Sequence, residues 1–559
     1  MLLDYNARRD TFIVRVEAGV DIKMLMREHG LDYSTSASGD GHHVLFTKDP
    51  YCAASFSNWA TPDAAMQLGD ILFEISESER NYSHAHIACP ADKELWSFQK
   101  ANIEYALRRR NTLIGDEPGL GKTAQAICFC NEIKADRVLI ICPASLRYQW
   151  HKNIQEWSTM PGPHGRQRIY VTAKGKDGTN NQCEWQIVSY DLARTPAIGA
   201  ALAREHYDAF ILDEPHYLKE TDSQRTRAIF GGGATRHFEP LASRAERVIG
   251  LTGTPLPNRP REAYTLARGL CWDSIDWASE EKFRLKYNPS FRYEHVDPAT
   301  GQTKYHIDER SGRHGELQNR LRRYFMCRHL KHGPRGVMPQ LKMPIYDLIY
   351  LEETRAVKSA LEAEKLLDID PEMLEGADMT TLGHISVVRK QMGIAMAPQV
   401  ADYVEMLLES GEDKITLFAW HIEVLNILQH RLERYGLIRI DGSTGPKKKH
   451  RLVQDFINNP KCRIALGNIL SMGTGTDGLQ KVCTHGLIAE PDWVASNNVQ
   501  CFDRLDRGGQ REQVQGDIFV VRQSIAEKVL AAALRKNQIT HKALDARVGD
   551  DDAFQKSRR

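Results

Sequence analysis

The sequence predicts an α/β protein with two tandem parallel-sheet lobes, helical insertions and a small α+β module at its N-terminus. From about residue 91, short apolar runs alternate with helical patterns, and a second series of the same kind begins at about residue 406. Continuous apolar strands separated by helices are typical of parallel sheets covered on both faces. The two series therefore indicate two copies of one architecture.

The N-terminal segment, residues 1–90, is acidic overall and differs in texture from the rest of the chain. It contains TFIVRVEAG, then DIKMLMREHGL, then HHVLFTKD. The first and third runs have the pattern of strands and the second that of a helix. We expect a small module that stands apart from the two α/β series.

The first α/β series occupies residues 91–270 and the second residues 406–535. Strands of the first are expected at VLIICP (138–143), QIVSYD (186–191), FILDEP (210–215) and RVIGLTGTP (247–255). Strands of the second are expected at ITLFAW (415–420), LIRIDGST (437–444), CRIALGN (462–468), HGLIAEP (485–491) and GDIFVV (516–521). Between them, residues 271–405 should form a polar, then helical, insertion and linker. Residues 536–559 are expected to be a flexible tail.

Composition narrows the class of protein without naming a partner. Apolar residues make up 42% and charged residues 26% of the 559 residues, as in globular proteins, and the formal net charge is +1. A nucleic-acid surface would therefore have to be a local basic groove. The eleven cysteines form no C-x-x-C pair, and Cys128 and Cys130 fall in an apolar run, which predicts buried thiols on a helix. With no run of 18 apolar residues, neither a signal peptide nor a membrane span is expected.

GDEPGLGKT, residues 115–123, ends like a phosphate-binding loop but departs from the general pattern. The pattern requires Gly, four residues, then Gly-Lys-Ser/Thr, and counting back from Lys122 places Asp116 where Gly is expected. The context fits, because an apolar run precedes the loop and a helical pattern follows. Gly119 and Gly121 would let phosphate approach the helix start, where backbone N–H groups bind anions. A Gly-rich turn before a core helix is the alternative.

A pair of acidic residues supports the nucleotide interpretation. FILDEPH places Asp213 and Glu214 at the C-terminal end of an apolar strand, where ligands of open α/β sheets bind. Mg²⁺ needs a carboxylate and an attacking water needs a base or orienting group. Lys122 would contact the β- and γ-phosphates, and Thr123 would join Asp213 in binding Mg²⁺. Together the two motifs favour Mg²⁺-dependent hydrolysis of a nucleoside triphosphate over an ordinary acidic loop.

At this point the sequence resembles the Swi/Snf-like ATPases of helicase superfamily two. Their first loop is written D-E-x-G-L-G-K-T, and this chain has DEPGLGKT, so Asp116 is the family form. The resemblance extends over roughly residues 93–535. It includes LWSFQKANI, ICPASLRYQWHKNIQEW, DEPH, LTGTPLPNRPRE, YFMCRHLK, RIDGST and QCFDRLDRGGQ. In the last of these, Asp506 stands where the family has His; the wording MGTGTDGLQ also departs from the family's.

The resemblance implies roles for particular residues. It places ATP and Mg²⁺ between two RecA-like lobes, with Gln99 reading adenine and Gln500 also at the nucleotide. It assigns nucleic-acid contact or coupling to a further set: Thr252, Thr254, Asn258, Ser443, Gly475 and Asp477. Arg504 and Arg507 would stabilise the charge that develops on the transferring phosphoryl group. Without the other motifs, these two arginines would read as a solvated salt-bridge face.

The sequence also resembles the HARP-type annealing-helicase branch and its compact bacterial and phage relatives, through FRLKY, GELQNRLRRYFMCRHLK, VRKQMGIAMAP and FAWH. This implies an ATP-dependent motor on double-stranded or forked DNA that reanneals strands or moves branches. A strand-separating DNA or RNA helicase and a non-catalytic DNA-binding scaffold remain alternatives. We expect a monomer in the cytoplasm of a bacterium or phage-infected cell, or in a nucleus if the source is eukaryotic. Two basic runs, RRR at 108–110 and KKK at 447–449, could contact phosphates, and the second is the better candidate. Such runs are more often solvated faces.

Overall fold

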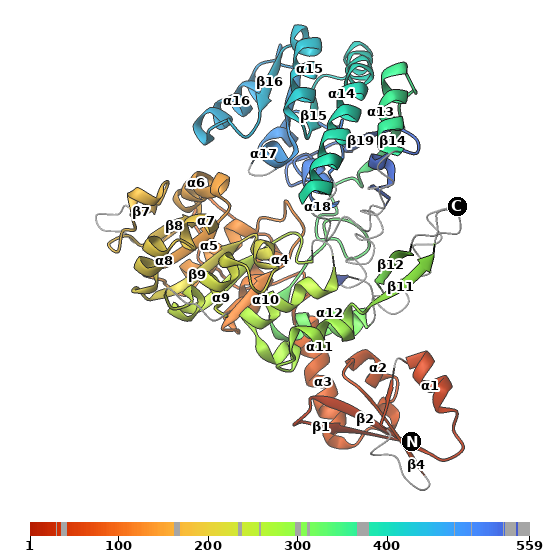
Figure 1. Ribbon diagram of the computed structural model, residues 1–559. Helices are drawn as coiled ribbons and strands as arrows, with labels where there is room; N and C mark the ends of the chain where they lie inside the picture. The colour runs from red at the N-terminus through yellow and green to blue at the C-terminus, as the bar shows by residue number, and fades with distance from the viewer. Residues whose placement is uncertain are drawn as a thin grey trace.

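The computed structural model describes residues 1–29, 31–34, 42–160, 168–232, 238–256, 259–296, 303–309, 313–365, 379–473, 476–492, 495–528, 530–531 and 544–545. Within these ranges an N-terminal module is followed by two α/β lobes, each with its own parallel sheet (Figure 1). The predicted fold class is confirmed. None of the described helices is both long enough and apolar enough to cross a membrane.

The N-terminal module is an antiparallel sheet with helices on one side. Its strands, in the spatial order β1-β2-β4-β3, are β1 (Leu2–Asn6), β2 (Thr11–Glu17), β4 (His42–Thr47) and β3 (Asp32–Tyr33). Its helices are α1 (Ile22–His29), α2 (Pro50–Ala54) and α3 (Pro62–Glu77). The predicted strand, helix and strand correspond to β2, α1 and β4. Alternate residues of β2, such as Phe12 and Val14, pack with Leu45 against Ile71 and Ile75 of α3.

The first lobe contains a seven-stranded sheet in which every pairing is parallel. In spatial order its strands are β13 (Met326–Cys327), β5 (Asn111–Ile114), β10 (Ala245–Leu251), β9 (Tyr207–Asp213), β6 (Val138–Cys142), β8 (Trp185–Ser189) and β7 (Ile169–Val171). Its helices include α4 (Ser97–Leu107), α5 (Lys122–Glu132), α6 (Arg147–Trp157), α7 (Tyr190–Ala193), α8 (Pro196–Ala203), α9 (Gln224–Phe230) and α10 (Ala263–Leu270).

Both faces of this sheet are buried, which explains the continuous apolar runs. In β6, Leu139 and Ile141 belong to one core cluster, whereas Ile140 and Cys142 belong to the other. Cys128 and Cys130 are buried on α5, as predicted. Because β5, β10 and β9 are neighbours, the segments that follow them emerge side by side at one edge of the sheet.

The second lobe has a six-stranded parallel sheet. In spatial order its strands are β14 (Ile345–Tyr350), β19 (Gln515–Val520), β18 (His485–Ile488), β15 (Ile415–Ala419), β17 (Ile464–Asn468) and β16 (Leu437–Ile440). Its helices are α13 (Arg355–Lys365), α14 (Met379–Glu409), α15 (Ile422–Leu432), α16 (Pro446–Asn458), α17 (Ile469–Gly473) and α18 (Ala495–Phe502). Every apolar run expected as a strand in the two series forms one.

The segment expected as an insertion, residues 271–405, contributes to both lobes. It contains α11 (Glu280–Tyr287), a hairpin of β11 (Ser290–Val296) and β12 (Thr303–Glu309), and α12 (His314–Tyr324). It then supplies the edge strand β13 to the first sheet and β14 to the second. Two residues of the expected tail also belong to the first lobe, since Leu544 and Asp545 are 4% and 1% exposed there.

Ion pairs fasten the N-terminal module to α12. Arg323 contacts Asp10 at 2.8 Å and Glu74 at 3.1 Å, and Arg313 pairs with Asp32. In Figure 1 the module lies next to α11 and α12 and away from the second lobe.

Candidate functional site

The phosphate loop lies between β5 and α5, and its glycines adopt a backbone that favours glycine. Gly119 and Gly121 have φ values of 89° and 73°. A Cβ on Gly121 would lie 2.4 Å from Nε2 of Gln99, so a side chain there would displace the Gln99 amide. Lys122 Nζ donates to the backbone oxygens of Asp116 and Glu117 at 2.7 and 3.2 Å. The loop thus forms a tight backbone cradle with a lysine at its centre, as phosphate binding requires.

Asp116 has a structural role that the loop pattern alone does not reveal. Its buried carboxylate accepts hydrogen bonds from Asn102 Nδ2 at 2.8 Å and Gln125 Nε2 at 3.0 Å. It also accepts from the backbone N–H of His329 at 2.9 Å and contacts its ring Nδ1 at 3.1 Å. Burial opposes the charge, but His329 and Gln125 outweigh it and lower the pKa of Asp116. This carboxylate therefore joins the phosphate loop to the chain that leaves edge strand β13.

Gln99 lies directly over the phosphate loop. Its Nε2 donates to the backbone oxygen of Leu120 at 3.0 Å, and its Oε1 accepts from the N–H of Trp96 at 2.9 Å. The amide is thereby held at the start of α4 and 5% exposed. This position beside the loop is compatible with the predicted contact to a nucleotide base.

Asp213 is positioned by a buried tryptophan. Trp150 of α6 is 2% exposed, and its Nε1 donates to Oδ2 of Asp213 at 2.7 Å. Burial, together with the neighbouring Glu214 charge, raises the pKa of Asp213. Trp150 packs in a core cluster of the first lobe. Its N–H also orients Asp213, the expected metal-binding carboxylate. The spacing of the two residues in the sequence does not predict this contact.

Glu214 belongs to a hydrogen-bonded triangle with two residues of neighbouring motifs. Its Oε2 accepts from Thr252 Oγ1 at 2.8 Å and lies 3.1 Å from His216 Nδ1. Thr252 Oγ1 in turn accepts from the N–H of Thr254 at 3.1 Å. Burial opposes the charge on Glu214, but His216 and Thr252 lower its pKa. Glu214 is therefore a carboxylate at neutral pH, tied directly to the loop after β10.

The two arginines expected from the second lobe follow α18, and Arg507 reaches the first lobe. A Cβ on Gly119 would lie 2.7 Å from Cβ of Arg507, so the two lobes touch at the phosphate loop. Arg507 Nη1 lies 3.3 Å from Asp477 Oδ1, and Arg504 Nη1 donates to the backbone oxygen of Thr476 at 3.2 Å. Both arginines are thus held by the dipeptide 476–477.

A buried ion cluster also joins the lobes at this point. Lys331, which follows β13, lies 2.6 Å from Asp503 Oδ1 and 2.6 Å from Asp506 Oδ2. His332 Nε2 lies 2.9 Å from the same Asp506 oxygen. Asp506, which departs from the family wording, therefore has a lysine and a histidine as partners across the contact.

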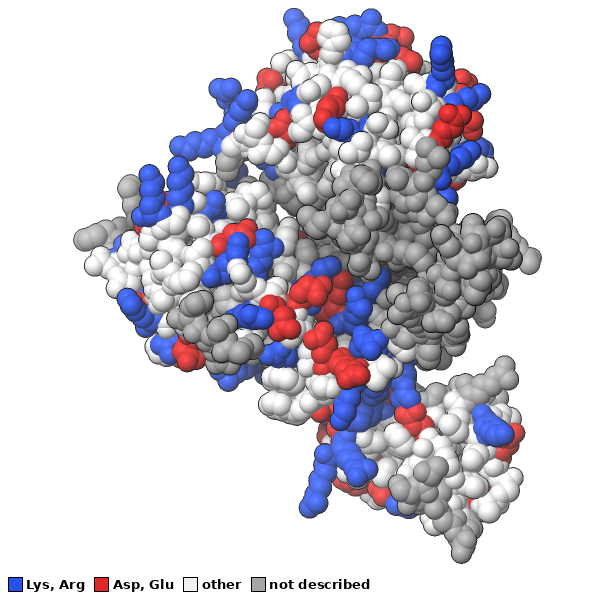
Figure 2. Space-filling view, viewed as in Figure 1, with Lys and Arg blue, Asp and Glu red and all other residues white. Residues whose placement is uncertain are grey.

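The lobes also enclose a basic groove of about 520 Å³. Its walls include Tyr148, Gln149 and Lys152 from α6, and on the second lobe side Lys447, Lys449, His450 and Lys481, with Thr476 and Asp477 beside them. Asp477 is the one carboxylate among the described lining residues. Basic side chains stand on both lobes near α6 and α16 (Figure 2). Two lysines of the run 447–449 therefore face a groove.

Three of the remaining predicted residues have described positions. Thr123 is in the first turn of α5, and Gln500 is on α18, where its backbone oxygen accepts from Arg504 Nε at 3.4 Å. Ser443 is exposed in the turn before α16 and donates to Asp441 at 2.6 Å. Asn258 and Gly475 lie outside the described residues.

The family profile described as SNF2-related domain matches residues 32–390. The chain belongs to the SNF2-related family. This confirms the resemblance to Swi/Snf-like proteins that the motifs indicated.

Curated relatives of this SNF2-related chain include proteins named for annealing activity. It is 30% identical over 466 residues to the DNA annealing helicase and endonuclease ZRANB3 of Bos taurus, covering 81% of this chain and 41% of that protein. It is 29% identical over 441 residues to the SWI/SNF-related matrix-associated actin-dependent regulator of chromatin subfamily A-like protein 1 of Bos taurus, covering 77% and 42%. The chain thus spans less than half the length of these relatives.

A comparison with solved structures includes the Sulfolobus solfataricus SWI2/SNF2 ATPase core in complex with dsDNA. The match has 15% sequence identity and a TM-score of 0.37, and it covers 84% of this chain and 100% of the other.

Proposed function

We propose that this chain is an ATP-dependent motor that moves on double-stranded DNA and remodels forks or joints by reannealing or branch migration. The observation that supports this most directly is the contact between the two parallel-sheet lobes at the phosphate loop. Gly119, three residues before Lys122, packs on Arg507 of the second lobe. A second observation, the basic groove bounded by the dipeptide that holds the arginines, supports coupling to a polyanion.

The residues around the phosphate loop are those that phosphoryl transfer needs. Lys122 would contact the phosphates of ATP, and Thr123 with Asp213 would hold Mg²⁺, which supplies positive charge to the phosphate oxygens. Two buried polar atoms close to this centre, Thr254 Oγ1 and Asp503 Oδ2, have no hydrogen-bond partner among the described residues, so the surroundings are polar enough to accommodate a charged ligand. Glu214 would orient the attacking water and accept its proton.

The two arginines would complete the site when the lobes close. Phosphoryl transfer spreads negative charge over oxygens that a guanidinium can contact with two N–H groups. Arg504 is held among buried groups, where burial and the Arg507 charge lower its pKa to about 10. It therefore stays a cation at neutral pH.

The dipeptide 476–477 offers a physical link between hydrolysis and the nucleic-acid track. Thr476 and Asp477 line the groove, and the same residues bind Arg504 and Arg507. A phosphate backbone entering the groove would repel the Asp477 carboxylate and so weaken its ion pair with Arg507. Arg507 would then be free to contact the transferring phosphate.

Duplex or forked DNA is proposed as the track because of the annealing helicase relatives and the groove's charge. Lys152, Lys447, Lys449 and Lys481 face one channel, and neutralising phosphates is the main source of non-specific affinity for DNA. We propose a monomer acting in the compartment that contains the DNA.

The test is ATP hydrolysis measured without nucleic acid and with duplex, forked DNA, single strands or RNA. Duplex or fork should stimulate turnover, and Lys122→Ala should abolish it. Arg507→Ala should retain ATP binding while turnover falls about 10³-fold, as for other arginines acting in trans. Equal turnover with and without nucleic acid would reject the motor.

The same assay separates the alternatives. Stimulation by single strands alone, with unwinding of a tailed duplex, would favour a strand-separating helicase. Normal ATP binding with no turnover under any condition would favour a non-catalytic DNA-binding scaffold.

A further inference from the structure

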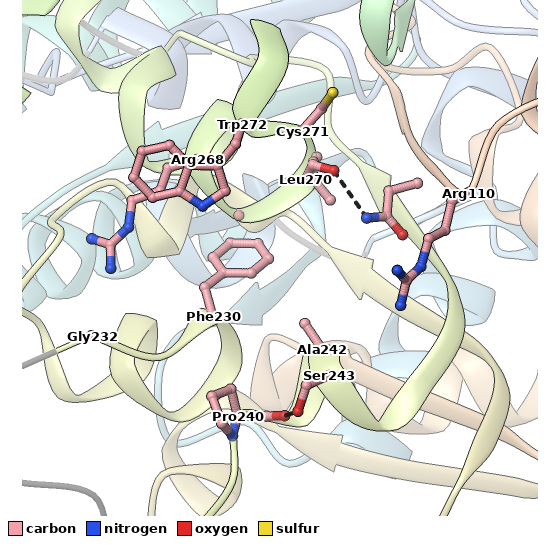
Figure 3. Close-up of a pocket in the computed structure, with 12 residues that line it drawn as sticks. Arg110, Phe230, Gly232, Pro240, Ala242, Ser243, Arg268, Leu270, Cys271 and Trp272 are labelled. Atoms are coloured by element: carbon pink, nitrogen blue, oxygen red, sulfur yellow. Dashed lines mark hydrogen bonds between the residues drawn. The ribbon is translucent and has the colours of Figure 1, made fainter. Parts of the chain in front are cut away.

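A second candidate site lies at the opposite end of the first lobe's sheet. A cavity of about 460 Å³ is lined by residues that precede β5 and β10, including Arg110 and Ser243, and by the end of α10 (Figure 3). The phosphate loop and the acidic pair follow the other ends of β5 and β9. The cavity is therefore separated from the nucleotide site by the length of the sheet.

The lining of this cavity combines aromatic rings with arginines. Phe230, Arg268 and Trp272 face it together with Arg110 (Figure 3), and no carboxylate is present among its described lining residues. The guanidinium of Arg268 lies 5.7 Å from the centre of the Trp272 ring. Such a combination favours a ligand that is both flat and anionic.

Trp272 is stacked on Trp277, and Trp277 lines a second, larger cavity. The rings of Trp272 and Trp277 are stacked, with centroids 4.9 Å apart and planes 6° from parallel. Trp277 lines a cavity of about 820 Å³ between the first lobe and the N-terminal module, together with Arg8, Arg9 and Lys48. Arg268, Trp272 and Trp277 thus form a continuous series from one cavity to the other.

Trp277 is 66% exposed, which is unusual for so large an apolar ring, and the structure holds it there. Asp276 and Trp277 both have positive φ, at 51° and 54°, which costs backbone energy in residues other than glycine. Asp276 is bound by Arg320 at 2.6 Å and Lys48 at 2.7 Å, and Trp277 Nε1 donates to Asp273 at 3.0 Å. The turn is therefore fixed with one ring presented to solvent.

The charges around Trp277 favour an anionic ligand once ion pairs are counted. Of the carboxylates that line the larger cavity, Asp10 is bound by Arg323, and Asp276 by Lys48 and Arg320, which leaves Asp273. Arg8 and Arg9 are exposed, and their guanidinium groups have no ion-pair partner among the described residues. Two such guanidinium groups thus line the same cavity as the exposed ring.

We propose that Trp277, Trp272 and Arg268, with Arg8, Arg9 and Arg110 around them, form a second nucleic-acid site that binds single-stranded DNA by base stacking. Successive bases stack on aromatic faces without sequence preference, while arginines contact the phosphates. The site is outside the groove between the lobes, and its binding needs no ATP. It would hold a strand exposed at a fork while the lobes hold the duplex.

The experiment measures binding of a fluorescent oligothymidine of about 16 nucleotides to the full chain without ATP. Trp277→Ala should weaken binding about tenfold, the loss expected for one stacked base, and Trp277→Phe should restore most of it. The double substitution Arg8→Ala and Arg9→Ala should make the slope of log K against log salt concentration shallower. The expected change is about 0.7 for each phosphate that the arginines no longer neutralise. Trp59→Ala is the matched control, since Trp59 is an exposed tryptophan of the N-terminal module that lines neither cavity.

Photocrosslinking with iodouracil in the oligonucleotide provides a direct readout, and the adduct is expected on Trp277. Adducts confined to the groove between the lobes, or Trp277→Ala binding within twofold of the unchanged chain, would overturn the proposal. Tighter binding of oligouridine than of oligothymidine would overturn the assignment to DNA. Because no step requires hydrolysis, these outcomes are independent of the ATPase test.

Discussion

Replacing Asp116 by glycine would restore the general phosphate-loop pattern, and the structure predicts that it would harm the protein. The residue has no positive φ, so glycine's conformational freedom is not needed there. The loss of the carboxylate would leave the His329 N–H and ring Nδ1 without the acceptor they contact at 2.9 and 3.1 Å. Asn102 and Gln125 would each keep another partner, at 3.0 and 3.1 Å.

The magnitude follows from those two orphaned groups. A buried donor without a partner costs about 1–3 kcal/mol, so Asp116→Gly should destabilise the first lobe by about 2–6 kcal/mol. For a domain of this size that corresponds to a fall in Tm of about 10 °C. Asp116→Asn keeps one oxygen and should lose about half as much.

The assay is thermal unfolding of the two variants beside Asp92→Ala. Asp92 is a suitable control because its side chain is 78% exposed and its contact with Lys93 is long, at 4.0 Å. Hydrogen exchange at residues 326–329 should accelerate in Asp116→Gly, since the carboxylate ties that segment to the loop. A Tm for Asp116→Gly equal to or above that of Asp116→Asn would refute the reasoning.

Three further predictions concern the contacts between the parts of the chain. Lys331→Met should leave Asp503 and Asp506 as buried carboxylates without their lysine, which should lower the free energy of unfolding by about 3–5 kcal/mol. X-ray scattering should then show more separated lobes, and an unchanged radius of gyration would contradict this. Asp545→Ala should lower Tm by several degrees because it removes the acceptor of a buried bidentate contact from Arg328, at 2.8 and 3.0 Å; an unchanged Tm would contradict this. Duplex binding should weaken as the pH rises through 8, because burial, with the Arg504 charge, lowers the pKa of Lys449 to about 8 and its cationic form lies below that value. In Lys449→Arg this pH dependence should disappear, since arginine stays charged; binding titrations at two pH values decide the point.

Local pattern was enough to predict the sheets but not all of their members. Runs such as VLIIC and FILD are apolar throughout because both faces of each strand are covered, so they could be recognised one at a time. Strands β13 and β14 could not, because one has two residues and the other is largely exposed. Their membership depends on pairing with distant strands, which a local pattern does not contain.

The candidate site shows the same division. Lys122, Asp213 and Glu214 follow strand ends, and the rule that ligands bind at the carboxyl edge of a parallel sheet brings them together. The hydrogen bonds that Trp150 donates to Asp213 and that the His329 N–H donates to Asp116 join residues 63 and 213 positions apart. These bonds arise from packing in three dimensions, and the spacing of the residues in the sequence does not predict them.

The return of Leu544 and Asp545 to the first lobe has a practical consequence for dissecting the molecule. That lobe is discontinuous in sequence, since its edge strand comes from residues 326–327 and its last ion pair from residue 545. A fragment that ends at residue 270 would lack β13 and Arg328, and β5 would become an unpaired edge strand. The lobes are better separated by circular permutation than by truncation, because a permuted chain can keep residues 326–328 and 544–545 together with the rest of the first lobe.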